Sequence, residues 1–182
     1  MKKKPDILHT ELVASSRLFN VESVHLRFSN GVETHYERMR SGVRGAVLIA
    51  PMLDDHTVLL IREYAVGVER YELALPKGKI EGDESIEDAA NREIQEEVGY
   101  GAKQLTHLRS MTVAPGYLGH QTHVVLAQDL YVNRLPGDEP EEIEVVPWSL
   151  HNLPALWENE ECTEARSIAT LFLIRDKLHG FG

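Results

Sequence analysis

The chain has 182 residues, of which 42% are hydrophobic and 26% are charged, a composition typical of one compact globular domain. An excess of Asp and Glu over Lys and Arg gives a formal net charge of −10. This charge disfavours binding to nucleic acid, because such binding depends on neutralising phosphates. No run is apolar enough to span a membrane, and the start MKKKP lacks the apolar segment of a secretory signal. The single cysteine, Cys162, permits no internal disulfide, so we expect a cytoplasmic protein.

In the N-terminal part of the chain, the residues from Leu12 to Arg40 have a strand-like pattern. Apolar residues partly alternate between residues 21 and 28, and the turn Ser29-Asn30-Gly31 leads into a second strand that ends at Arg40. Such strands would expose unpaired edges if they stood alone. We therefore expect either a hairpin that caps the same domain or an element that pairs with a second subunit.

The composition changes near Ser41, after which strands and helices are mixed. Residues 46–52 predict a buried strand, and residues 57–64 predict its neighbour after a polar turn. This order of elements predicts an α/β sandwich. Residues 105–117 predict one strand and a turn, and residues 123–133 predict another strand. Two helices are expected to finish the chain, one from about Pro154 and one from about Thr163 to His179.

The segment from Gly78 to Tyr100 carries the strongest chemical signal. Glu93, Glu96 and Glu97 stand at i, i+3 and i+4, which places them on one face of a helix. Like charges at this spacing cost an isolated helix roughly 0.2–0.5 kcal/mol per pair. A solvated acidic face is one interpretation, but a hard divalent cation would turn the repulsion into binding. The cluster therefore predicts a site for Mg²⁺ or Mn²⁺.

The residues around this cluster predict a fixed loop and a docked helix. Glycines and a proline mark the loop before it, polar residues 83–85 can cap the helix, and Gly99 can end it. An apolar stripe beside the acidic face would pack on a sheet. The stripe consists of Ile86, Ala90, Ile94 and Val98.

This segment resembles the signature of the Nudix hydrolases. That signature is Gly, five residues, Glu, seven residues, then Arg-Glu-aliphatic-x-Glu-Glu-x-Gly-aliphatic, and only the aromatic Tyr100 departs from it. The resemblance implies the Nudix fold, a mixed sheet between helices (α/β/α), over residues 43–182. It also implies that residues 1–42 are an N-terminal antiparallel β extension that commonly pairs two subunits. We therefore expect a homodimer.

The resemblance also implies roles for the residues of the signature. Glu93, Glu96 and Glu97 would bind the metal ion, together with the backbone carbonyl of Lys77, and Glu93 and Glu97 would be the main catalytic residues. The remaining signature positions would have structural roles, with Arg92 pairing with Glu84 to tie the loop to the helix. The residues with structural roles are Gly78, Glu84, Arg92 and Gly99.

An acidic loop at residues 138–142 is the next candidate. An isolated run of this kind is normally an exposed turn, but it resembles the loop that supplies a general base in the ADP-ribose pyrophosphatase branch of the family. The alignment makes Glu139 the base and Glu141 an added metal ligand. A carboxylate can act as a base when nearby charge raises its pKa or when a metal ion lowers that of water.

Substrate class follows from weaker features. Pro115 and Gly116 stand where the same branch carries a Pro-Gly loop, although Pro-Gly is also an ordinary turn. Arg40 and Arg62 are the best candidates to hold phosphate or adenine. The resemblance implies hydrolysis of ADP-ribose, NADH or short diadenosine polyphosphates with release of AMP. The alternatives are a non-catalytic sensor of ADP-ribose or NAD, or a hydrolase of nucleoside triphosphates, coenzyme A or capped RNA.

Overall fold

The computed structural model describes residues 2–40 and 44–180, which divide into two compact units. The N-terminal unit contains the described residues up to Gly45 together with Thr112–Gln121, and the second unit contains the rest. The expected boundary between residues 42 and 43 lies outside the described residues. None of the described helices has the length and apolar character needed to cross a membrane.

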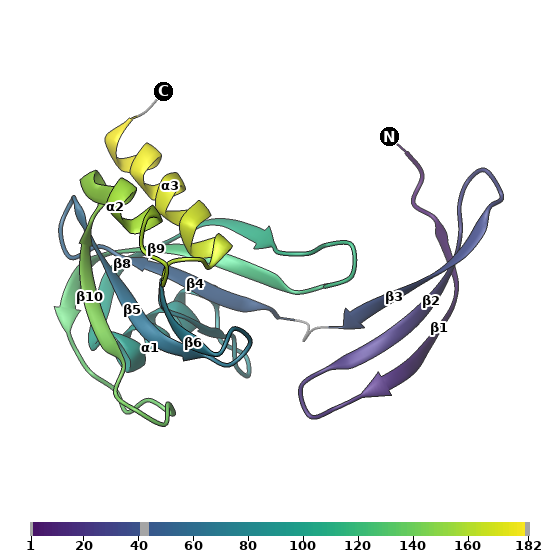
Figure 1. The fold of residues 1–182 in the computed structure, drawn as a ribbon, viewed down its shortest axis with the longest axis horizontal. Coiled ribbons are helices and arrows are strands. Elements are labelled where there is room, and N and C mark those ends of the chain that lie inside the picture. The colour runs from purple at the N-terminus through teal and green to yellow at the C-terminus, as the bar shows by residue number, and fades with distance from the viewer. Residues whose placement is uncertain (1, 41–43, 181–182) are drawn as a thin grey trace. The chain divides into compact units, whose positions relative to one another are not determined.

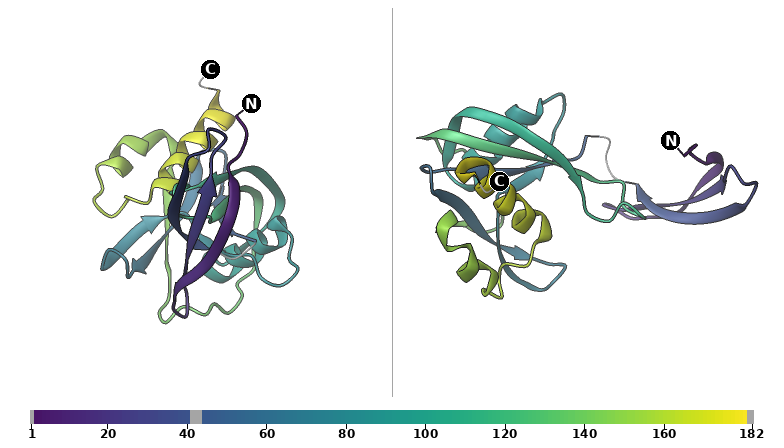
Figure 2. Two further views of the ribbon diagram at one scale, coloured as in Figure 1. Left: turned by 90° about the vertical axis from the view of Figure 1, so that its right-hand side faces the viewer. Right: turned by 90° about the horizontal axis from the view of Figure 1, so that it is seen from above.

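The N-terminal unit is built on a three-stranded antiparallel sheet in the order β1-β2-β3 (Figures 1 and 2). Its strands are β1 (Asp6–Ser15), β2 (Asn20–Arg27) and β3 (Glu33–Arg40). The predicted turn between β2 and β3 is confirmed, and Gly31 has a φ of 84°, which favours glycine. The prediction did not include the first half of β1. Every side chain of β1 is exposed, so burial imposes no apolar alternation on its sequence.

The second unit contains two sheets. A four-stranded sheet has the order β7-β4-β9-β8, and a three-stranded sheet has the order β10-β5-β6. Because β4 pairs in parallel with β9 and antiparallel with β7, the larger sheet is mixed. The strands are β4 (Ala46–Pro51), β5 (Thr57–Ala65), β6 (Arg70–Ala74), β7 (Lys77–Lys79), β8 (Tyr100–Thr112), β9 (Gln121–Val132) and β10 (Glu144–Ser149).

Helices cover both sides of these strands (Figure 1). The helices are α1 (Ile86–Glu97), α2 (Leu153–Trp157) and α3 (Ala165–His179), with a 3₁₀ turn at Leu150–Asn152 before α2. Along β4, Leu48 and Ala50 pack with residues of α2 and α3, whereas Val47 and Ile49 pack with residues of α1. This alternation follows from the two-residue period of a strand. The expected α/β architecture, a mixed sheet between helices, is confirmed.

One expected strand pairing is wrong. Strand β5 was predicted as the neighbour of β4, but it pairs with β6 and β10 in the other sheet. A single bridge between Met52 and Val58 links the segment after β4 to β5. Strand β4 and the first half of β5 are buried on both faces, so neither has the polar alternation there that would indicate its sheet partner.

Helix α1 begins where the sequence predicted. The Ser85 side chain accepts a hydrogen bond from the Asp88 backbone N–H at 3.0 Å, and Gly99 follows the last turn with a φ of 83°. Buried residues Ala89, Ala90 and Ile94 dock the helix against β4. The start of the metal-binding candidate is therefore held by a cap and by apolar packing.

We expect Ser85→Ala to lower the free energy of unfolding by about 1 kcal/mol, because it removes the acceptor at the start of α1. Urea unfolding followed by circular dichroism measures this change. Ser85→Thr keeps a hydroxyl acceptor, so its free energy of unfolding should fall much less. Equal losses in both variants would show that the hydroxyl does not stabilise the helix.

Candidate functional site

The acidic face of α1 contains two buried carboxylates. Glu93 and Glu97 are only 8% and 3% exposed, and Glu96 is partly buried beside them. Burial raises the pKa of Glu97 to about 8, and it also raises the pKa of Glu93. Neighbouring negative charges raise both pKa values further, because Glu93 repels Glu97 and Glu96 repels Glu93. A cation bound at this face would offset both the burial and the repulsion.

The loop before α1 approaches these carboxylates through its backbone. The Lys77 N–H donates a hydrogen bond to Glu97 Oε2 at 3.0 Å. A Cβ atom at Gly78 would lie 1.9 Å from the Cδ atom of Glu93, so only glycine fits beside that carboxylate as it stands. Lys77 and Gly78 belong to β7, which pairs with β4. The sheet therefore positions the backbone at Lys77, where a metal-binding carbonyl was predicted.

Arg92 connects the loop and the acidic face. Its Nε atom lies 2.7 Å from Glu84 Oε1, and its Nη2 atom donates to the Lys79 carbonyl at 2.9 Å. Its Nη1 atom lies 2.9 Å from both Glu93 Oε1 and Glu96 Oε2. The expected pair between Arg92 and Glu84 is present, and its proposed structural role fits these contacts.

The chemistry of this donor set fits a hard divalent cation. Carboxylate oxygens are the ligands that Mg²⁺ and Mn²⁺ prefer, and buried carboxylates with raised pKa values gain most from a cation. In the part of the chain that the structure describes, no three acidic, histidine or cysteine side chains are already arranged around one metal position. The guanidinium of Arg92 instead lies within hydrogen-bonding distance of Glu93 and Glu96. Water and the Lys77 carbonyl would complete a metal shell.

The acidic loop lies next to α1. Glu139 is close enough to Glu93 for its negative charge to raise the pKa of Glu93. This effect is smaller than the effects of burial and of the Glu96 charge. Glu139, Glu141 and Glu96 line one cavity of about 310 Å³ together with Arg134. The structure thus brings both acidic-loop candidates near the signature helix. Their roles as base and ligand remain predictions.

Arg62 lies on β5 near the same loop, but its charge is already paired. Its Nη1 atom lies 2.5 Å from Glu144 Oε2, and its Nε atom lies 3.0 Å from Glu161 Oε2. These contacts raise the pKa of Arg62, with the hydrogen bond to Glu144 as the main cause. To bind phosphate, this guanidinium would have to exchange a carboxylate partner.

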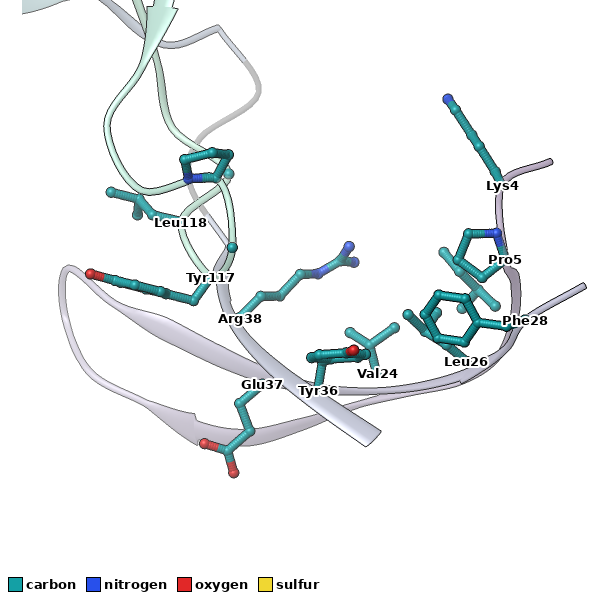
Figure 3. Close-up of a pocket in the computed structure, with 14 residues that line it drawn as sticks. Lys4, Pro5, Val24, Leu26, Phe28, Tyr36, Glu37, Arg38, Tyr117 and Leu118 are labelled. Atoms are coloured by element: carbon teal, nitrogen blue, oxygen red, sulfur yellow. The ribbon is translucent and has the colours of Figure 1, made fainter. Parts of the chain in front are cut away.

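The other substrate-binding candidates belong to the N-terminal unit. Pro115 and Gly116 line a pocket of about 520 Å³ that is formed entirely within this unit (Figure 3). Arg40 Nη1 pairs with Glu22 Oε1 at 3.1 Å and does not line this pocket. Aromatic side chains and one guanidinium form much of the lining, and such groups can stack on a base or bind phosphate. These residues are Phe28, Tyr36, Tyr117 and Arg38.

Sequence reasoning missed these pocket residues, although one signal was present. Val24 pairs with Tyr36 across β2 and β3, and both residues line the pocket, as does Leu26. The alternation of Val24, Leu26 and Phe28 therefore marked the pocket face of the sheet. Tyr71, which donates a hydrogen bond to Glu141 at 2.7 Å, carried no comparable signal.

Comparison with known proteins agrees with the signature. Residues 5–38 match the NudE-type Nudix hydrolase N-terminal domain, and residues 42–169 match the NUDIX domain. ADP compounds hydrolase NudE of Escherichia coli K12 is 53% identical over 180 residues, which is 99% of this chain and 96% of that protein. ADP-ribose pyrophosphatase of Bacillus subtilis is 29% identical and covers 86% of this chain and 85% of its own length. A crystal structure of ADP compounds hydrolase superposes with a TM-score of 0.92 at 52% identity, covering 100% of this chain and 98% of that one.

Proposed function

Because the chain belongs to the Nudix hydrolase family, we propose that it hydrolyses the pyrophosphate bond of ADP-containing compounds and releases AMP. The expected substrates are ADP-ribose, NADH and short diadenosine polyphosphates. The observation that carries this proposal is the pair of buried carboxylates, Glu93 and Glu97, on the acidic face of α1. Relatives that cover most of the chain support the substrate class, since their names refer to ADP compounds and ADP-ribose.

The residues of α1 would bind the substrate's phosphates indirectly. Nudix hydrolases generally need a divalent metal ion, which neutralises phosphate oxygens and lowers the pKa of water when bound. Glu93, Glu96 and Glu97 would hold Mg²⁺ or Mn²⁺ with the Lys77 carbonyl and, as we propose, Glu141. The oxygen ligands suit either ion.

Glu139 would accept the proton of the attacking water. The water oxygen would form a bond to one phosphorus atom as the bridging P–O bond breaks, and the bridging oxygen would leave with the other phosphate. Position and charge neutralisation then supply most of the rate, because a phosphate is a good leaving group. ADP-ribose would give AMP and ribose phosphate in equal amounts.

The N-terminal unit supports a homodimer. Its strand β1 exposes large apolar side chains, including Ile7 and Leu12 at 60% each, which a second copy could cover. Within the N-terminal unit, Pro115, Gly116 and Arg40 are proposed to contact the adenosine. For Arg62 of the second unit we propose, separately, a contact with phosphate. A cytoplasmic location is consistent with the buried free thiol of Cys162.

Incubating the full-length protein with ADP-ribose tests the proposal. With Mg²⁺ or Mn²⁺ we expect AMP and ribose phosphate in equal amounts by chromatography, and with excess EDTA we expect none. NADH and diadenosine triphosphate in parallel would rank the substrates. Tight binding of ADP-ribose without any product would favour a sensor, and turnover of nucleoside triphosphates or coenzyme A alone would indicate another specificity.

A further inference from the structure

The acidic loop is attached to the second unit at few points. Residues 133–143 connect β9 to β10 without a helix or a strand. Near its start, the Leu135 N–H donates to the Gln95 carbonyl at 3.0 Å, and near its end the side chain of Ile143 is buried. Between these points, the hydroxyl of Tyr71 donates a hydrogen bond to Glu141 Oε1 at 2.7 Å. This contact therefore fixes the middle of the loop.

Tyr71 is well placed to act as a fixed anchor. It lies on β6 directly opposite Tyr64 of β5, and the two rings make an edge-to-face contact with centroids 5.5 Å apart. Both rings are partly exposed, at 43% for Tyr71 and 48% for Tyr64, and the edge-to-face contact between them helps to orient the Tyr71 ring. Hydrogen bonding to the Glu141 carboxylate is the main cause that raises the pKa of Tyr71, which keeps the hydroxyl a donor.

Glu141, which Tyr71 holds, lies near the residues proposed to act in hydrolysis. Glu139 stands two residues before Glu141, and its negative charge contributes to the raised pKa of Glu93 on α1. A Cβ atom at Gly137 would lie 2.2 Å from Glu139 Oε2 and 3.8 Å from the Glu96 carbonyl oxygen. The Glu139 side chain thus folds back over the loop beside the end of α1. A shift of Glu141 would move this carboxylate as well.

We propose that Tyr71 is a positioning residue for hydrolysis: its hydroxyl holds Glu141, and through it Glu139, beside the carboxylates of α1. This inference rests on the proposed function, in which the acidic loop serves the reaction. The hydroxyl of Tyr71 contacts only Oε1 of Glu141, at 2.7 Å. Hydrogen bonds to charged groups are among the stronger ones in proteins, which suits this role.

The test compares Tyr71→Phe with Tyr64→Phe in the full-length protein. Tyr71→Phe keeps the ring and removes only the hydroxyl, so we expect kcat for ADP-ribose to fall about tenfold while KM changes little. Hydrogen–deuterium exchange should become faster at residues 138–142. Tyr64→Phe, on the opposite strand of the same hairpin, should leave both measurements unchanged. Wild-type kcat and wild-type exchange in Tyr71→Phe would overturn the proposal.

A double-mutant cycle with Glu141→Ala separates positioning from general stability. If Tyr71 acts through Glu141, Tyr71→Phe should have little further effect on kcat in the Glu141→Ala background. A full further loss in that background would mean that the hydroxyl acts elsewhere. If the wild-type protein turned over none of the substrates, the proposed function would fail, but the exchange comparison would still decide whether Tyr71 holds the loop.

Discussion

Glu97→Gln is expected to reduce the turnover of ADP-ribose by roughly 10²–10⁴-fold while the protein stays folded. Gln has nearly the same shape, and it can still accept a hydrogen bond from the Lys77 N–H, which lies 3.0 Å from Glu97 Oε2. It lacks the negative charge that a divalent cation requires. Steady-state kinetics with a range of Mg²⁺ concentrations measures the loss, which extra metal should only partly restore.

The same substitution should stabilise the metal-free protein at high pH. Burial raises the pKa of Glu97 to about 8 in the folded state, from an ordinary value of 4.5. Because this pKa is raised in the folded state, the contribution of Glu97 to folding stability is fully present below pH 4.5 and is lost as the pH rises through about 8. Gln cannot lose a proton. At pH 9 in EDTA we therefore expect the free energy of unfolding of Glu97→Gln, measured with urea, to be higher than that of the wild type by on the order of 2 kcal/mol.

A matched control lies on the same helix. Glu87 stands in the first turn of α1 and is exposed, so Glu87→Gln changes the charge of the helix without changing the acidic face. It should leave turnover near that of the wild type. Full activity in Glu97→Gln, or equal losses in both variants, would contradict a metal site at Glu97.

The local features of the site could be predicted because they depend on spacing along the chain. The separation of Glu93 from Glu97 places both carboxylates on one face of α1, and the glycine at position 78 leaves room for Glu93. The Arg92 pair with Glu84 likewise joins two parts of one short segment. Such contacts need only the geometry of one helix and one loop.

The contacts that could not be predicted join segments far apart in the chain. Strand β5 and strand β4 have similar apolar sequences, so nothing in them indicates that they belong to different sheets. The hydrogen bond from Tyr71 to Glu141 spans 70 residues and depends on where β6 and the acidic loop meet. The same limit applies to the pocket beside Pro115, which combines β2 and β3 with a distant loop. Packing between distant segments determines these contacts, and the periodicity of apolar residues along one segment does not predict such packing.

Gly78→Ala is expected to lower turnover by roughly 10–100-fold with a change in unfolding free energy below about 1 kcal/mol. An added Cβ would lie 1.9 Å from both Cδ and Oε1 of Glu93 and 2.1 Å from Oε2. The neighbour that must move is the flexible end of a side chain, so the fold can adapt at small cost. The carboxylate that moves is, however, a proposed metal ligand, and its new position would no longer match Glu97.

Gly67→Ala is the matched control, because a Cβ at Gly67 would meet nothing within 4 Å. It should keep wild-type turnover and similar stability, so the comparison isolates the clash with Glu93. A higher Mg²⁺ requirement in Gly78→Ala alone would show that the displaced carboxylate binds metal. If Gly78→Ala kept full turnover at limiting Mg²⁺, Glu93 could act from another position, and the close approach of the β7 backbone would be unrelated to catalysis.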